Sequence, residues 1–348
     1  MASTAQSRIR SVSYAKYGYM FILPFFLVYC FFQIWPLINT FILSVYGNGK
    51  TVNDFIGLGN FEQILFGTSG GVADVRSDKL QSSFGTSLFN TIILWFGNFI
   101  PQIALSLALA VWFTDAKLKI PGKGFFKVIM YMPNIITAAS VAALFLKIFG
   151  NSEFGVVNRL FINWGLIDKT ECFKFVSDPW KSRIVIMFIQ TWLWFGNTMI
   201  MLMSGIMGLN PSLFEAANID GASSGQVFRK ITLPLLRPIM LYTLITSMIG
   251  GLQMFDIPFM YQAGRNTFNE HTKTIAMFIF NHVHQQAATV ETQDYGYSGA
   301  ASVILFLITI ALGSITFYMN RDKEAIARKK ERKANLKALK AKERGVRA

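Results

Sequence analysis

Charged residues are scarce in this sequence, and cysteine and histidine are scarcer still. Asp, Glu, Lys and Arg make up 15% of the 348 residues, whereas roughly 25% is usual in soluble proteins. Cys30 and Cys172 fall in an apolar run and a polar connection, so they predict neither a disulfide framework nor a zinc site. No nucleophile–base pair or metal-ligand motif is present. We therefore expect neither a soluble protein nor an enzyme, and no metal or cofactor in this chain.

Apolar residues are, by contrast, abundant. Ala, Val, Ile, Leu, Met, Phe, Trp, Tyr and Cys supply 52% of the chain, which contains 33 Phe. A helix needs about 20 mainly apolar residues to cross a bilayer, and continuously apolar runs cross as helices, not as barrel strands. The sequence predicts an all-α polytopic membrane protein with six transmembrane helices, at residues 19–46, 87–113, 125–149, 183–208, 238–261 and 296–319.

Basic residues are distributed unevenly between the connections. The connections on one side of the six runs, with both ends of the chain, hold 21 Lys and Arg, and those on the other side hold nine. Because basic residues collect on the cytoplasmic side, both termini are predicted to be cytoplasmic, in a plasma (inner) membrane. The chain divides into an N-terminus (1–18), a six-span domain (19–319) and a basic tail (320–348) against the anionic membrane lipid. The net charge of +14 comes without a nucleic-acid-binding motif, so no nucleic acid is expected.

The cytoplasmic connection at 210–237 has the signals of a short helical hairpin. Asn210 can cap a first helix that has Pro211 at its first position, where a missing N–H costs nothing. Gly221 suits the left-handed residue that closes such a helix. Ser223 or Ser224 can cap a second helix.

The second helix is expected to end before Pro234, because proline restricts the residue that precedes it. Ala217 and Gly221 lie four residues apart and would share one face of the hairpin. Small residues there would let another protein come close, and Glu215 offers a carboxylate for a basic residue of that protein. The hairpin therefore predicts a docking element on the cytoplasmic side.

The spacing of this segment resembles the EAA loop of ABC importer permeases. The matching residues are Glu215-Ala216-Ala217, three residues, Gly221, nine residues, Ile231, one residue and Leu233-Pro234. Further stretches resemble the carbohydrate branch of that family, in the six-span form of the maltose-type first permease subunit: Leu23–Ser44, Ile56–Phe61, Gly122–Ile136 and Phe255–Gly264. The resemblance implies the maltose-type (type I) permease fold.

The resemblance also implies partners and a mechanism. A permease of this kind pairs with a second homologous permease and two ATP-binding subunits, and receives an oligosaccharide from an extracytoplasmic solute-binding protein. ATP and Mg are then bound by the partner ATPase. In the coupling contact with that ATPase, Glu215 would pair with a basic residue, and Ala216, Ala217 and Gly221 would form the close-contact face. Glycerol phosphate or a polyol is an alternative solute.

Polar and aromatic residues inside the runs are candidates for solute contact, because burying them in lipid is costly. Asp256 is the only carboxylate within a run. Carboxylate and amide groups can bind sugar hydroxyls, while aromatic rings cover the apolar face of a sugar. The predicted solute-facing residues are Trp194, Asn197, Ser247, Gly251, Gln253, Met254 and Asp256. Gln253 and Asp256 could instead join helices at the contact between the two permeases.

A different class of transporter is also open to test. An ion-coupled secondary transporter usually carries an inverted repeat and several ionisable residues within its spans. Asp256 is here the sole such carboxylate and no repeat is visible, so this class is the less favoured one. Gly49-Lys50-Thr51 imitates the end of a phosphate-binding loop, but Ser44 stands where its first glycine belongs. ATP hydrolysis is therefore expected from another chain.

Overall fold

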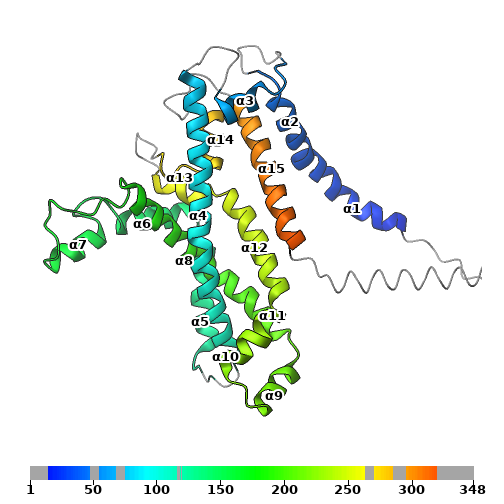
Figure 1. Ribbon diagram of the computed structural model, residues 1–348, viewed down its shortest axis with the longest axis vertical. Coiled ribbons are helices and arrows are strands. Elements are labelled where there is room, and N and C mark those ends of the chain that lie inside the picture. The colour runs from blue at the N-terminus through cyan, green and yellow to red at the C-terminus, as the bar shows by residue number, and fades with distance from the viewer. Residues whose placement is uncertain are drawn as a thin grey trace, which may run out of the picture. The chain divides into compact units, whose positions relative to one another are not determined.

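The computed structural model describes residues 15–47, 55–67, 75–115, 118, 120–262, 270–284 and 295–319. Within these ranges the chain is almost entirely helical, and the only strand-like pairing is one antiparallel bridge between Tyr46 and Phe55. The predicted basic tail and most of the predicted N-terminal segment lie outside the described residues. The all-α fold class is confirmed for the described part of the chain (Figure 1).

The helices follow one another with short connections. Those in the first part of the chain are α1 (Ala15–Tyr29), the π-helical turn η1 (Cys30–Ile34), α2 (Trp35–Ser44), α3 (Gly59–Phe66), α4 (Val75–Thr114), α5 (Lys123–Tyr131), the 3-10 turn η2 (Met132–Ile135), α6 (Ala138–Ile148) and α7 (Val156–Asn163). Those in the second part are α8 (Pro179–Met207), α9 (Pro211–Ile219), α10 (Ser224–Val227), the π-helical turn η3 (Phe228–Thr232), α11 (Leu233–Leu235), α12 (Arg237–Leu252), α13 (Asp256–Gln262), α14 (Ile275–Val283) and α15 (Tyr295–Met319).

Four of the six predicted spans are single stretches of helix. Among the described residues, the helices long and apolar enough to cross a membrane are Tyr17–Ser44, Ser83–Thr114, Pro179–Met207 and Tyr295–Met319. They match the first, second, fourth and sixth predicted spans. Two bent helix pairs bring the number to six if each pair forms one span.

The third predicted span, 125–149, is not one straight helix. Lys123–Ile135 and Ala138–Ile148 meet at an angle of 96°. Pro133 lies in the 3-10 turn η2, and Ile136 and Thr137 are extended. Thr137 then caps α6, because its side-chain oxygen accepts a hydrogen bond from the Ser140 N–H. The prediction of a continuous helix was wrong here, since local capping and proline chemistry outweigh the uniform hydropathy.

The fifth predicted span, 238–261, is also interrupted. Helix α12 ends at Leu252, and α13 begins at Asp256 after a turn at Gln253. The apolar helical path instead extends in the other direction, because Ser224–Leu235 and Arg237–Leu252 form the second bent pair, with an angle of 64°. The predicted start of this span was therefore too late and its end too late as well.

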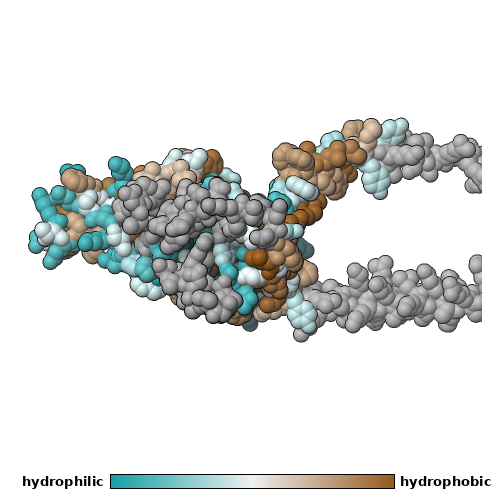
Figure 2. Space-filling view, turned by 90° about the horizontal axis from the view of Figure 1, so that it is seen from above, coloured by the Kyte–Doolittle hydropathy of each residue, from teal (hydrophilic) through white to brown (hydrophobic). Residues whose placement is uncertain are grey.

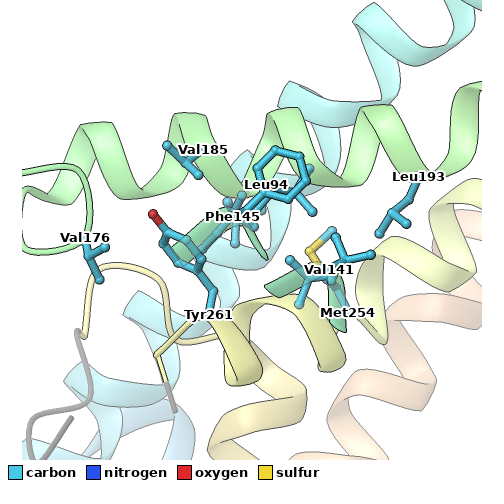
Figure 3. Close-up of a cluster of buried hydrophobic side chains, with 11 residues drawn as sticks. Leu94, Val141, Phe145, Val176, Val185, Leu193, Met254 and Tyr261 are labelled. Atoms are coloured by element: carbon cyan, nitrogen blue, oxygen red, sulfur yellow. The ribbon is translucent and has the colours of Figure 1, made fainter. Parts of the chain in front are cut away.

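The described chain divides into two compact units. Unit 1 comprises Met1–Gln81 with Ile279–Ile304, and unit 2 comprises Ser82–Phe278 with Leu305–Ala348. The main core of unit 2 forms where α6, α8 and α13 meet α4 (Figure 3). It contains Leu94, Val141, Phe145, Val176, Val185, Ile186, Ile189, Leu193, Met254, Ile257 and Tyr261.

Polar residues join α4 to α8 within unit 2. Asn98, Gln102 and Ser106 recur every fourth residue on α4, so they share one face, and all three are buried. The bonds of this α4–α8 zipper run from Gln102 Nε2 to Thr198 Oγ1 (2.7 Å), from Ser106 Oγ to the Phe195 carbonyl (2.8 Å) and from Thr191 Oγ1 to the Asn98 carbonyl (3.1 Å). Hydrogen bonds of this kind hold helices together where water is absent.

In unit 1, small residues bring α15 close to α2. A Cβ at Gly299 would lie 3.1 Å from the Thr40 carbonyl oxygen, and one at Gly296 would lie 2.7 Å from that of Tyr46. The Asn60 amide donates to the carbonyls of Ser44 and Tyr46, both at 2.9 Å, and so closes α3 onto the end of α2. Helix α1 is different, because its apolar side chains are exposed (Figure 2).

Candidate functional site

The segment 210–236 folds as the predicted helical hairpin, and its first helix is α9. The Asn210 side chain accepts a hydrogen bond from the Ser212 N–H (3.1 Å), and Pro211 is the first helical residue. Gly221 adopts φ +71°, in the left-handed region. The Ala222 N–H then bonds the Ala217 carbonyl (2.9 Å) and the Gly221 N–H bonds the Asn218 carbonyl (3.2 Å). This pair of bonds is a Schellman motif, which terminates the helix.

The second helix of the hairpin begins with a capping box. The Ser223 side chain accepts from the Gln226 N–H, and the Gln226 side chain accepts from the Ser223 N–H. The helix does not end before Pro234 as predicted, because the π-helical turn η3 leads into α11, which contains Pro234. A π turn redirects backbone acceptors and so accommodates the N–H that proline lacks. The chain bends only afterwards, ahead of α12.

The hairpin lies at the end of unit 2 where α4 ends and α5 begins (Figure 1). Glu215, Ala216 and Gly221 are exposed, and Ile219 keeps 86% of its surface accessible. Ala217 differs, since only 7% of its surface is accessible. The small size of Ala217 therefore serves packing within this chain, whereas the other three predicted coupling residues are open to a partner.

Four of the predicted solute-facing residues are exposed in unit 2. Trp194 and Asn197 lie three residues apart on α8, so they share one face. Gln253 and Asp256 flank the interruption between α12 and α13 and are exposed as well. Non-helical backbone within a span is tolerated where it is packed in protein or lines a water-filled cavity. These four residues therefore remain available to a polar ligand.

The other three predicted solute residues are occupied by contacts within the chain. The Trp95 ring lies against Gly251, where any Cβ would overlap it, and Trp95 Nε1 donates to Ser247 Oγ (3.3 Å). Met254 is buried in the main core, and its carbonyl accepts from Thr274 Oγ1 (2.7 Å). Ser247, Gly251 and Met254 thus position α12 and do not line an open surface in this structure.

Sequence reasoning missed how α8 is held beside the third span. A Cβ at Gly196 would overlap the Met130 carbonyl, so the two backbones are in direct contact. The Asn134 side chain donates to the Leu193 carbonyl (3.4 Å). These contacts fix α8 next to the bend between α5 and α6, on either side of Trp194 and Asn197. The available signal was the glycine at 196, whose partner lies far away in sequence.

A second missed feature is a buried basic cluster at the other end of unit 2. The Arg183 guanidinium donates to Asn90 Oδ1 (2.7 Å) and to the His271 carbonyl (2.8 Å). The Asn90 amide in turn donates to the carbonyls of Glu270 (2.7 Å) and Lys273 (3.0 Å). Burial lowers the pKa of the Lys273 ammonium below its ordinary value, and the nearby Glu270 carboxylate opposes this shift. The cluster clamps the turn before α14 onto α4 and α8.

Comparison with known proteins follows directly from this arrangement. Residues 102–323, which include the hairpin and α8, match the family described as binding-protein-dependent transport system inner membrane component. The chain belongs to this family. It is therefore a membrane component of a transport system and not an enzyme, as predicted. The less favoured class of ion-coupled transporter has no support.

Curated relatives of this permease extend over nearly its whole length. It is 27% identical over 324 residues to the lactose transport system permease protein LacF of Rhizobium radiobacter, covering 93% of this chain and 100% of the relative. It is 25% identical to the arabinooligosaccharides permease AraP of Bacillus subtilis (92% and 94% covered) and to the trehalose/maltose permease MalF of Thermococcus litoralis (88% and 94% covered). The predicted carbohydrate ABC permease family is confirmed.

The fold of this permease has also been seen in solved structures. A bacterial ABC transporter that imports the acidic polysaccharide alginate matches with a TM-score of 0.71 and 22% identity, over 88% of this chain and 95% of that chain. The same alginate transporter, in complex with a periplasmic protein that holds an alginate pentasaccharide, matches equally well at 21% identity. At this identity the likeness shows the fold, and it confirms the predicted importer permease architecture.

Proposed function

We propose that this permease forms half of the membrane pathway of an ATP-driven importer for an oligosaccharide. The observation that carries the proposal is the family match across 102–323, together with relatives named for lactose, arabinooligosaccharides and trehalose or maltose. A second, homologous permease supplies the other half. Glycerol phosphate or a polyol stays an alternative solute within the same class.

In this proposal the hairpin is the coupling element. Glu215, Ala216 and Gly221 are exposed on a hairpin whose ends are fixed by caps, so force applied to it reaches α8 and α12 without loss of helical structure. Two ATP-binding subunits bind ATP and Mg, and one of them contacts this hairpin. Ala217 supports the contact from within, because it packs inside the chain.

The proposed solute surface consists of Trp194, Asn197, Gln253 and Asp256. It combines an aromatic face with one carboxylate and two amides, which suits the apolar and hydroxyl faces of a sugar. An extracytoplasmic solute-binding protein delivers the sugar to this surface, and both termini of the chain, with the tail at 320–348, lie on the cytoplasmic side. Gln253 and Asp256 keep the alternative role of joining the two permeases.

Purification in mild detergent tests the proposed assembly. The chains that co-elute with the tagged permease are identified by mass spectrometry. We expect a second permease with its own EAA segment, an ATP-binding subunit and, with solute present, a solute-binding protein that carries a trapped sugar. A permease that elutes alone yet drives solute uphill after reconstitution would contradict the proposal.

A further inference from the structure

The connection between α6 and α8 forms a small lobe, here called the outer lobe (residues 149–178), that contains α7. Two asparagines hold it together. The Asn158 side chain donates to the carbonyls of Gly150 (2.9 Å) and Phe173 (3.0 Å), and accepts from the Phe173 N–H (2.9 Å). The Asn151 side chain accepts from the Val176 N–H (2.7 Å). The outer lobe is therefore an ordered structure, and what it exposes has a defined direction.

The outer lobe exposes an apolar stripe. Val156, Leu160 and Trp164 follow one another at four-residue spacing, so they lie along one side of α7 and its end. Their accessible fractions are 48%, 44% and 67%. Phe154 and Leu166, on either side of them in sequence, are 80% and 62% accessible. Five large apolar side chains exposed within thirteen residues mark a surface that contacts an apolar medium or partner.

The stripe is continuous with a membrane span through a row of aromatic rings. Phe188 belongs to the apolar helix α8, and its ring lies 6.4 Å from that of Phe149. The row then proceeds from Phe149 to Phe175 (5.3 Å), Phe173 (5.7 Å), Phe161 (5.5 Å) and Trp164 (6.2 Å). The exposed apolar surface of the span therefore leads without a polar break to Trp164. This continuity favours lipid as the medium around the stripe.

Charge does not attract a partner to the outer lobe. Its basic residues, with the first turn of α8, are matched one for one by acidic residues: Arg159, Lys169, Lys174 and Lys181 against Glu153, Asp168, Glu171 and Asp178. The side visible from the end where α4 begins is mainly hydrophilic around α7 (Figure 2). A lobe with no net charge, a polar side and an aromatic-rich apolar stripe has the composition of a segment that lies in a membrane interface.

We propose that the outer lobe lies in the headgroup layer of the extracytoplasmic leaflet, with Val156, Leu160 and Trp164 inserted at the boundary with the acyl chains. The binding is apolar, so it does not depend on anionic lipid. The lobe thereby fixes the depth and tilt of the outer ends of α6 and α8, which carry it. The inference rests on the membrane location of the permease and not on its solute.

Cysteine accessibility tests this placement in the complete chain. Cys30→Ser and Cys172→Ser provide the background, into which Leu160→Cys and Trp164→Cys are introduced, with Asn163→Cys and Lys169→Cys as matched exposed controls. Each variant is reconstituted in phosphatidylcholine liposomes and treated with a membrane-impermeant maleimide. We expect about tenfold slower labelling at 160 and 164 than at the controls, since an apolar setting suppresses thiolate formation. Equal rates at all four positions would overturn the proposal.

Two further readouts separate lipid from a protein partner and from misfolding. Addition of the solute-binding protein should leave the rates at 160 and 164 unchanged; slowing that occurs only on its addition would assign the stripe to that protein and overturn the lipid placement. In the otherwise unaltered chain, Trp164→Phe should reduce the fraction of tryptophan emission quenched by lipids brominated near the headgroup. Unchanged quenching would likewise contradict the proposal. Neither outcome bears on co-elution with the ATP-binding subunit, so the proposed function is judged separately.

Discussion

At the scale of single residues, glycine decides how closely the helices of unit 2 approach one another. Gly250 and Gly251 are neighbours on α12, yet a Cβ at Gly251 would overlap the Trp95 ring while one at Gly250 meets nothing within 4 Å. The contact also holds Trp95 where it can donate to Ser247. The two positions therefore form a matched pair in which only one glycine is required by packing.

We expect Gly251→Ala to lower the free energy of unfolding by about 1–3 kcal/mol, because an overpacked core forces side chains and backbone to shift. Gly250→Ala should leave stability unchanged or raise it by up to about 1 kcal/mol, since alanine is the better helix former. Thermal unfolding of the two purified variants in the same detergent measures the difference. Equal melting temperatures would show that Trp95 can move aside.

A second residue-level prediction concerns the exposed polar groups of the proposed solute surface. Asn197→Ala and Asp256→Asn should each lower solute uptake about tenfold or more, which corresponds to the loss of one hydrogen bond or one charge-assisted hydrogen bond. Uptake of labelled solute into proteoliposomes measures the effect. Ser204→Ala, at another exposed position of α8 whose hydroxyl bonds its own helix, is the control. Normal uptake with impaired co-elution of the second permease would assign Asn197 and Asp256 to the permease contact instead.

At the scale of elements, the hairpin owes its shape to one left-handed residue. Gly221 has φ +71° and Gly225 does not, and a Cβ would meet nothing within 4 Å at either position. Gly221→Ala should therefore destabilise the hairpin by about 1 kcal/mol through backbone strain alone, whereas Gly225→Ala should not. Hydrogen exchange of the amides of α9 in the reconstituted permease reports the difference. Equal exchange in both variants would mean that the Schellman closure contributes nothing.

The coupling role of the same hairpin is tested by charge. Glu215→Lys reverses an exposed charge without touching the caps, so the chain should still fold and enter the membrane. Solute-stimulated ATP hydrolysis of the reconstituted importer should fall to the unstimulated rate, because a basic residue of the ATPase would then face a like charge. Glu171→Lys, an exposed acidic position in the outer lobe, is the control. Normal stimulation with Glu215→Lys would argue against docking at this position.

The α4–α8 zipper makes a further prediction at the element scale. Gln102→Leu and Thr198→Val each leave one buried polar group without its partner, while the double variant removes both. We expect the double variant to be less destabilised than the sum of the single ones, with a coupling energy of about 0.6–2 kcal/mol. Unfolding in detergent for the four proteins gives this coupling. Strict additivity would show that the bond at 2.7 Å contributes nothing to helix association.

Two π-helical turns show why some element boundaries could not be predicted. Both η1 and η3 end two residues before a proline, at Pro36 and Pro234. The sequence indicates the missing N–H of proline, and a helix end is the simplest response to it. The chain uses another response, since each π turn shifts the bonding pattern and the helix continues. Which response occurs depends on packing around the turn and not on local sequence.

At the scale of the whole molecule, the predicted orientation can be examined directly. In the background without cysteine, Asn218→Cys in α9 should react with an impermeant maleimide only in inside-out vesicles. Lys169→Cys in the outer lobe should react only in intact cells, because the two connections are predicted to lie on opposite sides. Labelling by mass shift after denaturation gives the result. Reaction of Asn218→Cys from the exterior would invert the proposed topology.

The success of the sequence-based predictions follows the range of the interactions involved. Asn210, Gly221 and Ser223 act on residues within a few positions, and their caps formed as predicted. Hydropathy, a sum over about twenty residues, located four spans as single helices. Gly251 and Met254 were assigned to an open surface because their partners, Trp95 and Thr274, lie in other parts of the chain. A single sequence does not reveal such pairs.

The α4–α8 zipper also limits how the protein can move. Its bonds are buried, and sliding one helix along the other would break them in a medium that offers no substitute donors or acceptors. The two helices must then travel together as one stiff strut through any change of state. Flexing is left to the joints beside them, at residues 136–137 and 253–255, where the backbone already departs from the helix. A stroke delivered at one end of the strut would thus be felt at the other with little damping.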